Sequence, residues 1–108
     1  ANLQVDGDDD RIRFRRAALN LKMRKQKDAL ADYAHVIENN PNDDEAYKLQ
    51  GDVYYEMGRF DNAVKNYSKA LSFKPEGSGL IYAARANAYR KLGRYDLAAQ
   101  DAQSAQQK

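Results

Sequence analysis

The sequence predicts an all-α fold of six helices, arranged as about three antiparallel pairs. The chain repeats itself: Pro41 and Pro75 lie 34 residues apart, and the same offset relates Tyr33 to Tyr67. Within each copy, small and aromatic residues recur at steps of three and four, which is the spacing of one helix face. Glycine or proline separates these segments, where each ends a helix. A repeat of this length is typical of stacked helical units.

Taken in order, the predicted helices span residues 9–23, 26–39, 43–57, 60–73, 79–92 and 95–107. Acidic and capping side chains in 8–10 and 42–44 fit helix starts, where they satisfy free amide groups and complement the helix dipole. Residues 1–8 are predicted to be a flexible segment, and residues 9–108 to be one domain. Its three units fall at approximately 10–43, 44–78 and 79–108.

The first unit is the least regular of the three. Its first helix carries an apolar stripe at positions i, i+3, i+4 and i+7, which predicts its core face: Phe14, Ala17, Ala18 and Leu21. These residues align with the third helix at an offset of 33, opposite Tyr47, Gln50, Gly51 and Tyr54. We therefore expect a turn near 24–26 that is one residue shorter and lacks the helix-ending glycine of the other units.

The second and third units repeat more closely, at an offset of 35 that relates Tyr54 to Tyr89 and Gly58 to Gly93. The additional residue falls in 76–79, where two glycines allow an insertion. Small residues such as Gly51 are predicted to let helices approach where tyrosines fill the neighbouring gaps. Seven tyrosines fit packing positions: Tyr33, Tyr47, Tyr54, Tyr67, Tyr82, Tyr89 and Tyr95. Tyr55 is left over, either as a partner contact or as an ordinary surface tyrosine.

The composition fits a soluble globular domain, with 31% charged and 43% hydrophobic residues in 108. No stretch approaches the roughly 20 apolar residues of a membrane helix, and no secretory signal is recognisable. The absence of cysteine excludes disulfides and thiolate chemistry. The chain begins at Ala1, which leaves open a processed mature protein, a shortened chain or a piece of a longer one. A cytoplasmic location is favoured, and an exported mature protein stays open.

The central unit, AYKLQGDVYYEMGRFDNAVKNYSKALSFKP, resembles the tetratricopeptide repeat, with the aromatic, glycine, tyrosine, alanine and proline positions of that family in order. The resemblance covers about residues 10–108 and departs at Gln50, where leucine is usual. It implies a right-handed α-solenoid whose first helices line a concave groove, and a protein–protein interaction scaffold that binds a peptide or partner protein there.

The groove predicted from the resemblance and the core stripes takes side chains from the first helix of every unit. The residues expected to contact a partner are Arg15, Arg16, Leu19, Lys22, Lys48, Asp52, Tyr55, Asn87, Arg90 and Lys91. Six of them are basic, which favours an acidic segment or a C-terminal carboxylate. The carboxylate clamp of some family members is matched only in part, because Asp52 replaces its asparagine and would repel a ligand carboxylate.

Two other functions stay open beside groove binding. Residues 11–27 carry eight Arg and Lys and no acid, which permits nucleic-acid or other anion binding. Against nucleic acid, the charges are spread around the helix, and the acids of 6–10 partly cancel them. Self-association is the second alternative, because Ile12, Leu19 and Met23 form an apolar face distinct from the core stripe. The missing neighbour is another repeat, a second subunit giving a homo-oligomer, or the partner.

The sequence predicts no enzyme, no metal site and no cofactor. His35 is the only histidine, and it lies in a helix among apolar neighbours with no catalytic constellation. The run Asp43–Glu45 contains three consecutive acids at a helix start, which do not converge on one ion and are better explained as capping residues.

Overall fold

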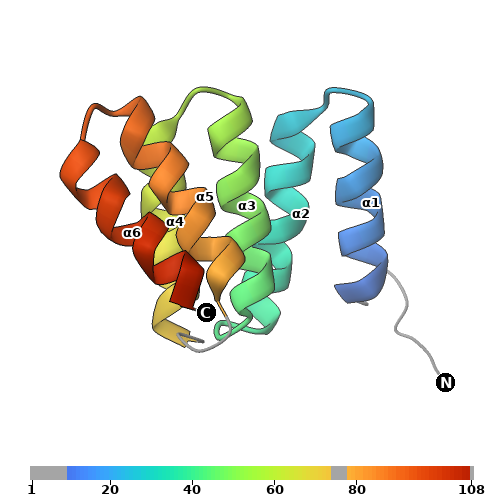
Figure 1. Ribbon diagram of the computed structural model, residues 1–108. Helices are drawn as coiled ribbons and strands as arrows, with labels where there is room; N and C mark the ends of the chain where they lie inside the picture. The colour runs from blue at the N-terminus through green and yellow to red at the C-terminus, as the bar shows by residue number, and fades with distance from the viewer. Residues whose placement is uncertain (1–9, 74–77, 108) are drawn as a thin grey trace, which may run out of the picture.

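Six α-helices form a row of three helix pairs in the computed structural model, which describes residues 10–73 and 78–107 (Figure 1). Their bounds are α1 (Asp10–Lys22), α2 (Gln26–Asn39), α3 (Asp44–Glu56), α4 (Phe60–Phe73), α5 (Gly79–Lys91) and α6 (Tyr95–Gln107). Each helix packs against the next, and α3 also contacts α5. The predicted all-α fold of three antiparallel pairs is confirmed. The predicted flexible segment 1–8 and the helix end at Pro75 lie outside the described residues.

The turn inside each helix pair has the same geometry in all three units. Arg24, Gly58 and Gly93 adopt positive φ values of 63°, 78° and 78°. In the central turn the amide of Gly58 donates to the carbonyl of Tyr55, and the amide of Arg59 donates to the carbonyl of Tyr54, at 3.0 and 2.8 Å. These two hydrogen bonds together form a Schellman motif, which satisfies the last carbonyl groups of the helix.

The first turn forms the same two bonds without a glycine. The amide of Arg24 donates to Leu21, and the amide of Lys25 donates to Asn20, at 3.0 and 2.7 Å. Arg24 therefore occupies the position of Gly58, at an offset of 34. The expected offset of 33 and the shortened turn are wrong, because an arginine takes the left-handed conformation that the other units give to glycine.

This register changes which residue of α1 faces the core. Ala17 is the counterpart of Gly51 and is fully buried, whereas Ala18, also expected in the core, is exposed. The position needs a small residue because the second helix sends an aromatic ring against it. A Cβ atom built on Gly51 would lie 2.8 Å from Cε1 of Tyr67. The tyrosine of α4 thus fills the space that the glycine leaves.

Two interior clusters join the pairs across their boundaries. Ala17, Ala29, Tyr33 and Val53 link α1 and α2 to α3. The second cluster links α4 to α5 and contains Ala63, Tyr67, Ala70, Leu71, Ile81 and Ala88. The start of α3 is capped as expected, since Oδ1 of Asp43 accepts the amide of Ala46 at 3.1 Å. Packing between units and local capping together hold the row of helices.

One of the seven tyrosines expected to pack does not. Tyr95 is 67% exposed at the start of α6. Its counterpart in the preceding pair, Phe60, is covered by the ring of Tyr55, with the two ring centroids 5.2 Å apart. The residue equivalent to Tyr55 beside Tyr95 is Arg90, which provides no ring. Tyr95 therefore lacks the aromatic cover that its position has in the central pair.

Candidate protein-binding surface

The exposed side of α3 and α5 is the candidate site, and we call it the first-helix face. The two helices contact each other, and residues from the starts of both line one pocket. It consists of Lys48, Leu49, Asp52, Leu80, Asn87, Arg90 and Lys91. Four predicted contact residues lie on α3 or α5 with their polar groups on this surface: Lys48, Asp52, Asn87 and Arg90. Lys91 is exposed at the end of α5.

Asp52 is the best-held polar group of this face. Its Oδ2 accepts a hydrogen bond from Nζ of Lys48 at 2.8 Å, one helical turn away. Its Oδ1 accepts the hydroxyl of Tyr67, which reaches through from α4 beside Gly51. Burial and then the Asp52 hydrogen bond raise the pKa of Tyr67, so the hydroxyl stays protonated. The carboxylate is oriented from two sides before any partner arrives.

A pocket of about 410 Å³ opens between the starts of α3 and α5. Lys48 and Leu49 line it from α3, and Leu80 and Ile81 line it from α5. Leu80 is 80% exposed, the highest value among the large apolar residues described. The sequence reasoning missed Leu80, although its place one turn before a packing position, directly after a glycine-rich loop, was a usable signal. Three acids, Asp43, Asp44 and Glu45, also border the pocket.

The opposite end of the face is basic. Nη1 of Arg90 donates to Oδ1 of Asn87 at 3.0 Å, which holds the guanidinium along α5. Lys91 is exposed beside it. Among the described residues, Lys91 forms no ion pair. The face therefore offers an apolar pocket with acids at one end and cationic groups at the other.

Tyr55 differs from its expected role as an aromatic that packing leaves free. It is half-buried, and its ring meets Phe60 edge to face. It also packs against the cluster that joins α4 to α5. Most of its side chain is therefore used inside the fold, because it covers the first residue of α4.

The residues predicted on α1 do not share one surface. Arg15 and Lys22 are exposed at the positions equivalent to Leu49 and Glu56 of α3. Arg16 instead makes a bidentate pair with Asp32 of α2, with Nη2 to Oδ1 at 2.7 Å, and this hydrogen bond raises the arginine pKa. Leu19 is 53% exposed and lies on the side of α1 that faces away from α2. The one-residue error in register explains these displacements.

The eight basic residues at 11–27 also lie in different environments. Arg13 is only 9% exposed, and Arg16 is paired with Asp32. Such a distribution does not form the continuous cationic stripe that tracks a phosphate backbone. It favours a local structural role for part of this charge.

Other site types find little support in the described part of the chain. In that part, no three His, Cys, Asp or Glu side chains lie where they could hold a metal ion together. None of its helices has the length and apolar character needed to cross a membrane. His35 is half-exposed, with Nδ1 3.3 Å from Oε1 of Glu38 in the next turn of α2.

Comparison with known proteins identifies the repeat. Tetratricopeptide repeat sequence profiles match residues 44–76 and residues 80–107. A crystal structure of MamA superposes with a TM-score of 0.88 at 26% identity, covering 94% of this chain and 59% of the MamA chain. A second MamA structure gives 0.85 at 27% identity, covering 93% and 54%. The chain thus spans little more than half the length of these structures. No curated protein sequence matches it significantly.

Proposed function

Because the chain belongs to the tetratricopeptide repeat family, whose members are protein–protein interaction scaffolds in general, we propose that its first-helix face binds a segment of another protein. The observation that carries the proposal is the pocket between α3 and α5, where Leu80 is 80% exposed. An apolar side chain of the partner would fill it and bury Leu80 and Leu49. Burial of apolar anchors supplies most of the affinity in such interfaces.

The polar groups around the pocket suggest the orientation of the segment. Next to the pocket, the acids of 43–45 suit a basic or amide group. At the far end, Arg90 and Lys91 suit a carboxylate. The sequence predicted that six basic residues would favour an acidic ligand along the whole groove. Two of them are already paired, Lys48 with Asp52 and Arg16 with Asp32, so fewer cations are available to such a ligand. We propose an acidic contact only beside Arg90 and Lys91.

Asp52 would act by its orientation. Tyr67 and Lys48 hold its carboxylate in place, so it can accept a hydrogen bond from a backbone amide of the partner without losing side-chain freedom on binding. A carboxylate at this point also disfavours an approaching carboxylate, which directs the acidic part of a ligand towards α5. That catalysis plays no part in this function remains a prediction.

Selection from a random peptide library displayed on phage, against the immobilised chain, tests the proposal. Enriched peptides are then titrated by fluorescence polarisation against the wild type, Leu80→Ser and Arg90→Ala. We expect the Leu80 variant to weaken binding by about tenfold, the usual loss on removing an interface anchor. The Arg90 variant should weaken only peptides that carry a carboxylate.

The matched control is Lys65→Ala, which changes an exposed residue of α4 that does not line the pocket. Circular dichroism of all variants checks that helicity is unchanged. If the selected peptides bind the Leu80 variant and the wild type equally, the pocket is not the site. If only Lys65→Ala weakened the binding of the selected peptides, recognition would lie on the second helices instead.

A further inference from the structure

The two junctions inside the row are built by the same three positions of a first helix. α3 packs on α2, and α5 packs on α4. The positions are filled by Ala46 and Val53 of α3 with Met57 directly after it and, at an offset of 35, by Ile81 and Ala88 of α5 with Leu92 directly after it. The first two residues of each set are at most 8% exposed. These positions therefore define how a first helix docks on the preceding pair.

α1 carries large apolar residues at the same positions and leaves them open. At an offset of 34 they are Ile12, Leu19 and Met23, which we call the α1 docking face. They are 43%, 53% and 59% exposed. Apolar residues gathered on one open face mark an interaction site.

α6 leaves the complementary face open at the other end of the row. The residues of α4 that lie under α5 include Phe60, Val64 and Leu71, which are half-buried or buried. Their counterparts in α6 are Tyr95, Ala99 and Gln106, which are all exposed and which we call the α6 docking face. Figure 1 shows α1 and α6 at the two ends of the helix order, so neither face meets the other within one chain.

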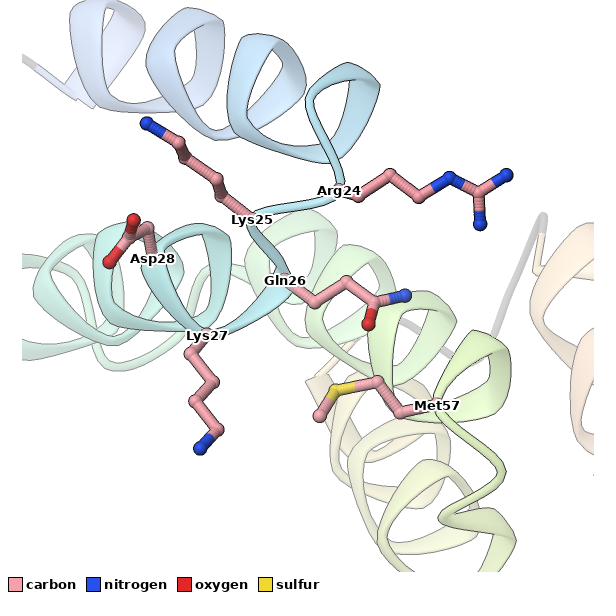
Figure 2. Close-up of a pocket in the computed structure, with 6 residues that line it drawn as sticks. All are labelled: Arg24, Lys25, Gln26, Lys27, Asp28 and Met57. Atoms are coloured by element: carbon pink, nitrogen blue, oxygen red, sulfur yellow. The ribbon is translucent and has the colours of Figure 1, made fainter.

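The pockets at the turns between paired helices show how the surroundings of α6 differ from those of α2 and α4. Figure 2 shows Gln26, after the first turn, beside Met57 of α3, and both line one pocket. Phe60 and Leu92 line the equivalent pocket after the second turn. In the part of the chain that the structure describes, the third pocket is lined by 93–97 and by no residue of a following first helix. Directly after α1, Met23 occupies the position of Met57 and Leu92.

We propose that a second copy of this chain docks head to tail, with the α1 docking face of one copy on the α6 docking face of the other. The sizes of the side chains are complementary. Inside the row, Val53 packs in one cluster with Leu30, and Ala88 in the other with Val64. At the new junction the large residue lies on the first helix, as Leu19, and the small one on the second, as Ala99.

Charge and hydrogen bonding agree with the same arrangement. At exposed positions α1 carries Arg11, Arg15 and Lys22, and α6 carries Asp96, whereas Arg16 and Asp101 are already paired inside their own helix pairs. Inside the row, Nη1 of Arg85 donates to Oγ of Ser68 in the preceding helix, at 3.0 Å. The equivalent residues at the new junction are Arg16, whose side chain is 54% exposed, and Gln103. The second copy thus supplies a hydrogen-bond acceptor to an arginine that Asp32 already orients.

Such a contact joins two different surfaces, so it leaves one free face of each kind on every assembly. The association continues the row of helices and does not close. Sedimentation velocity of the wild type should show a mean mass that rises with protein concentration past that of a dimer. A closed symmetric dimer would stop there, and this outcome would overturn the proposal.

Blocking each face separately gives the sharper experiment. Leu19→Asp places a charge on the α1 docking face, and Ala99→Arg places a large cation on the α6 docking face. Both positions are exposed, so both variants should fold. Each variant alone should stay monomeric. An equimolar mixture should form dimers and nothing larger, because one intact face of each kind remains.

Matched changes elsewhere separate this contact from groove binding. Ala31→Arg alters an exposed alanine on the solvent side of α2, and Leu80→Asp alters the first-helix face. Both should associate like the wild type. The proposal is overturned if the wild type remains monomeric throughout, if the mixture does not form dimers, or if Leu80→Asp prevents association as strongly as Leu19→Asp. Peptide binding at Leu80 can succeed or fail independently of each result.

Discussion

The first and third helix pairs contain the same ion pair in different surroundings. Arg16 with Asp32, and Arg85 with Asp101, are each separated by 16 residues and each bidentate, with shortest contacts of 2.7 Å. The Arg16 side chain is 54% exposed and that of Arg85 only 19%. In the central pair, Asn66 donates to Gln50 at the same separation. In all three pairs a polar interaction therefore joins the two helices at this position. It is an ion pair in the first and third pairs and a hydrogen bond between two amides in the central pair.

The neighbouring pair decides how deeply this interaction is buried. Arg85 lies over the rings of Tyr82 and Tyr89, with centroid distances of 5.7 and 5.6 Å, and donates to Ser68 of α4. The counterparts of the two tyrosines in α1 are Arg13 and Asn20. Local sequence therefore specifies the ion pair, and the preceding pair and the aromatic neighbours specify its environment.

Replacing the arginine of each ion pair should change the unfolding free energy more than any other substitution considered below. Arg85→Leu leaves Asp101, which is 5% exposed, without its cation, and we expect a loss of about 3 kcal/mol in unfolding free energy. Arg16→Leu should cost less, about 2 kcal/mol, because Asn20 still donates to Asp32, although the Asp32 carboxylate, at 4% exposed, is as buried as that of Asp101. Urea titration followed by circular dichroism measures both. Equal losses would show that burial by the neighbouring pair does not control the strength of the ion pair.

High pH should distinguish Tyr67 from Tyr33, its counterpart in the first pair. Burial raises the pKa of both, and the hydrogen bond to Asp52 raises that of Tyr67 further. The unfolded chain releases this proton near pH 10, so stability present below that pH is lost above it, by about 1.4 kcal/mol per pH unit for Tyr67.

The measurement is the unfolding free energy of the wild type, Tyr67→Phe and Tyr33→Phe between pH 9 and about 11.5. Tyr67→Phe should lose stability less steeply than the wild type. Tyr33→Phe should keep most of the wild-type slope, since its tyrosine lacks a carboxylate partner among the described hydrogen bonds. If the unfolding free energies of the wild type and Tyr67→Phe fell in parallel with pH, the hydrogen bond to Asp52 would not be the reason for a raised pKa of Tyr67.

A Cβ at the central helix crossing should cost stability that the outer pairs do not lose. In Gly51→Ala, contact with the Tyr67 ring costs about 2 kcal/mol, and the higher helix propensity of alanine returns about 1. The expected net loss is about 1 kcal/mol. Ala17 and Ala86 accept the same atom at equivalent positions. In a Tyr67→Leu background, Gly51→Ala should become stabilising, and persistence of the loss there would assign it to another contact.

The regular part of the fold was predictable because its signals are local. The spacing of Gly58, Gly93 and the tyrosines placed six helices within a residue or so of their observed ends, and the family assignment was confirmed. The register of the first unit was predicted wrongly because Arg24 occupies the turn position at which the other units have a recognisable glycine. Phe14, Ala17, Ala18 and Leu21 are apolar at helical spacing in either register, so the stripe alone could not decide between them.

The candidate surface was less predictable, since it depends on which side chains the fold already uses. Lys48 and Asp52 were found from their positions, but their mutual bond and the hydroxyl of Tyr67 became visible only in three dimensions. Tyr55 looked free because its partner, Phe60, lies across a turn. The binding roles assigned to these residues stay predictions.

The smallest expected effect returns to the turns of the first and central pairs. Arg24 adopts φ 63°, and Figure 2 shows its side chain directed away from Asp28; among the described residues it forms no ion pair that would offset the backbone cost. Arg24→Gly removes about 1 kcal/mol of left-handed strain and adds about 0.5 kcal/mol of unfolded-state entropy. The expected result is a gain of about 0.5 kcal/mol, measured by urea titration.

The reverse change supplies the control for this prediction. Gly58 has open space within 4 Å of an added Cβ, so Gly58→Arg should lose a similar amount through its backbone alone. If both changes follow these signs, the two turns are equivalent and differ only in which residue occupies the left-handed position. A loss of stability in Arg24→Gly would instead mean that the arginine side chain stabilises the first pair, and the first turn would no longer be a strained copy of the second.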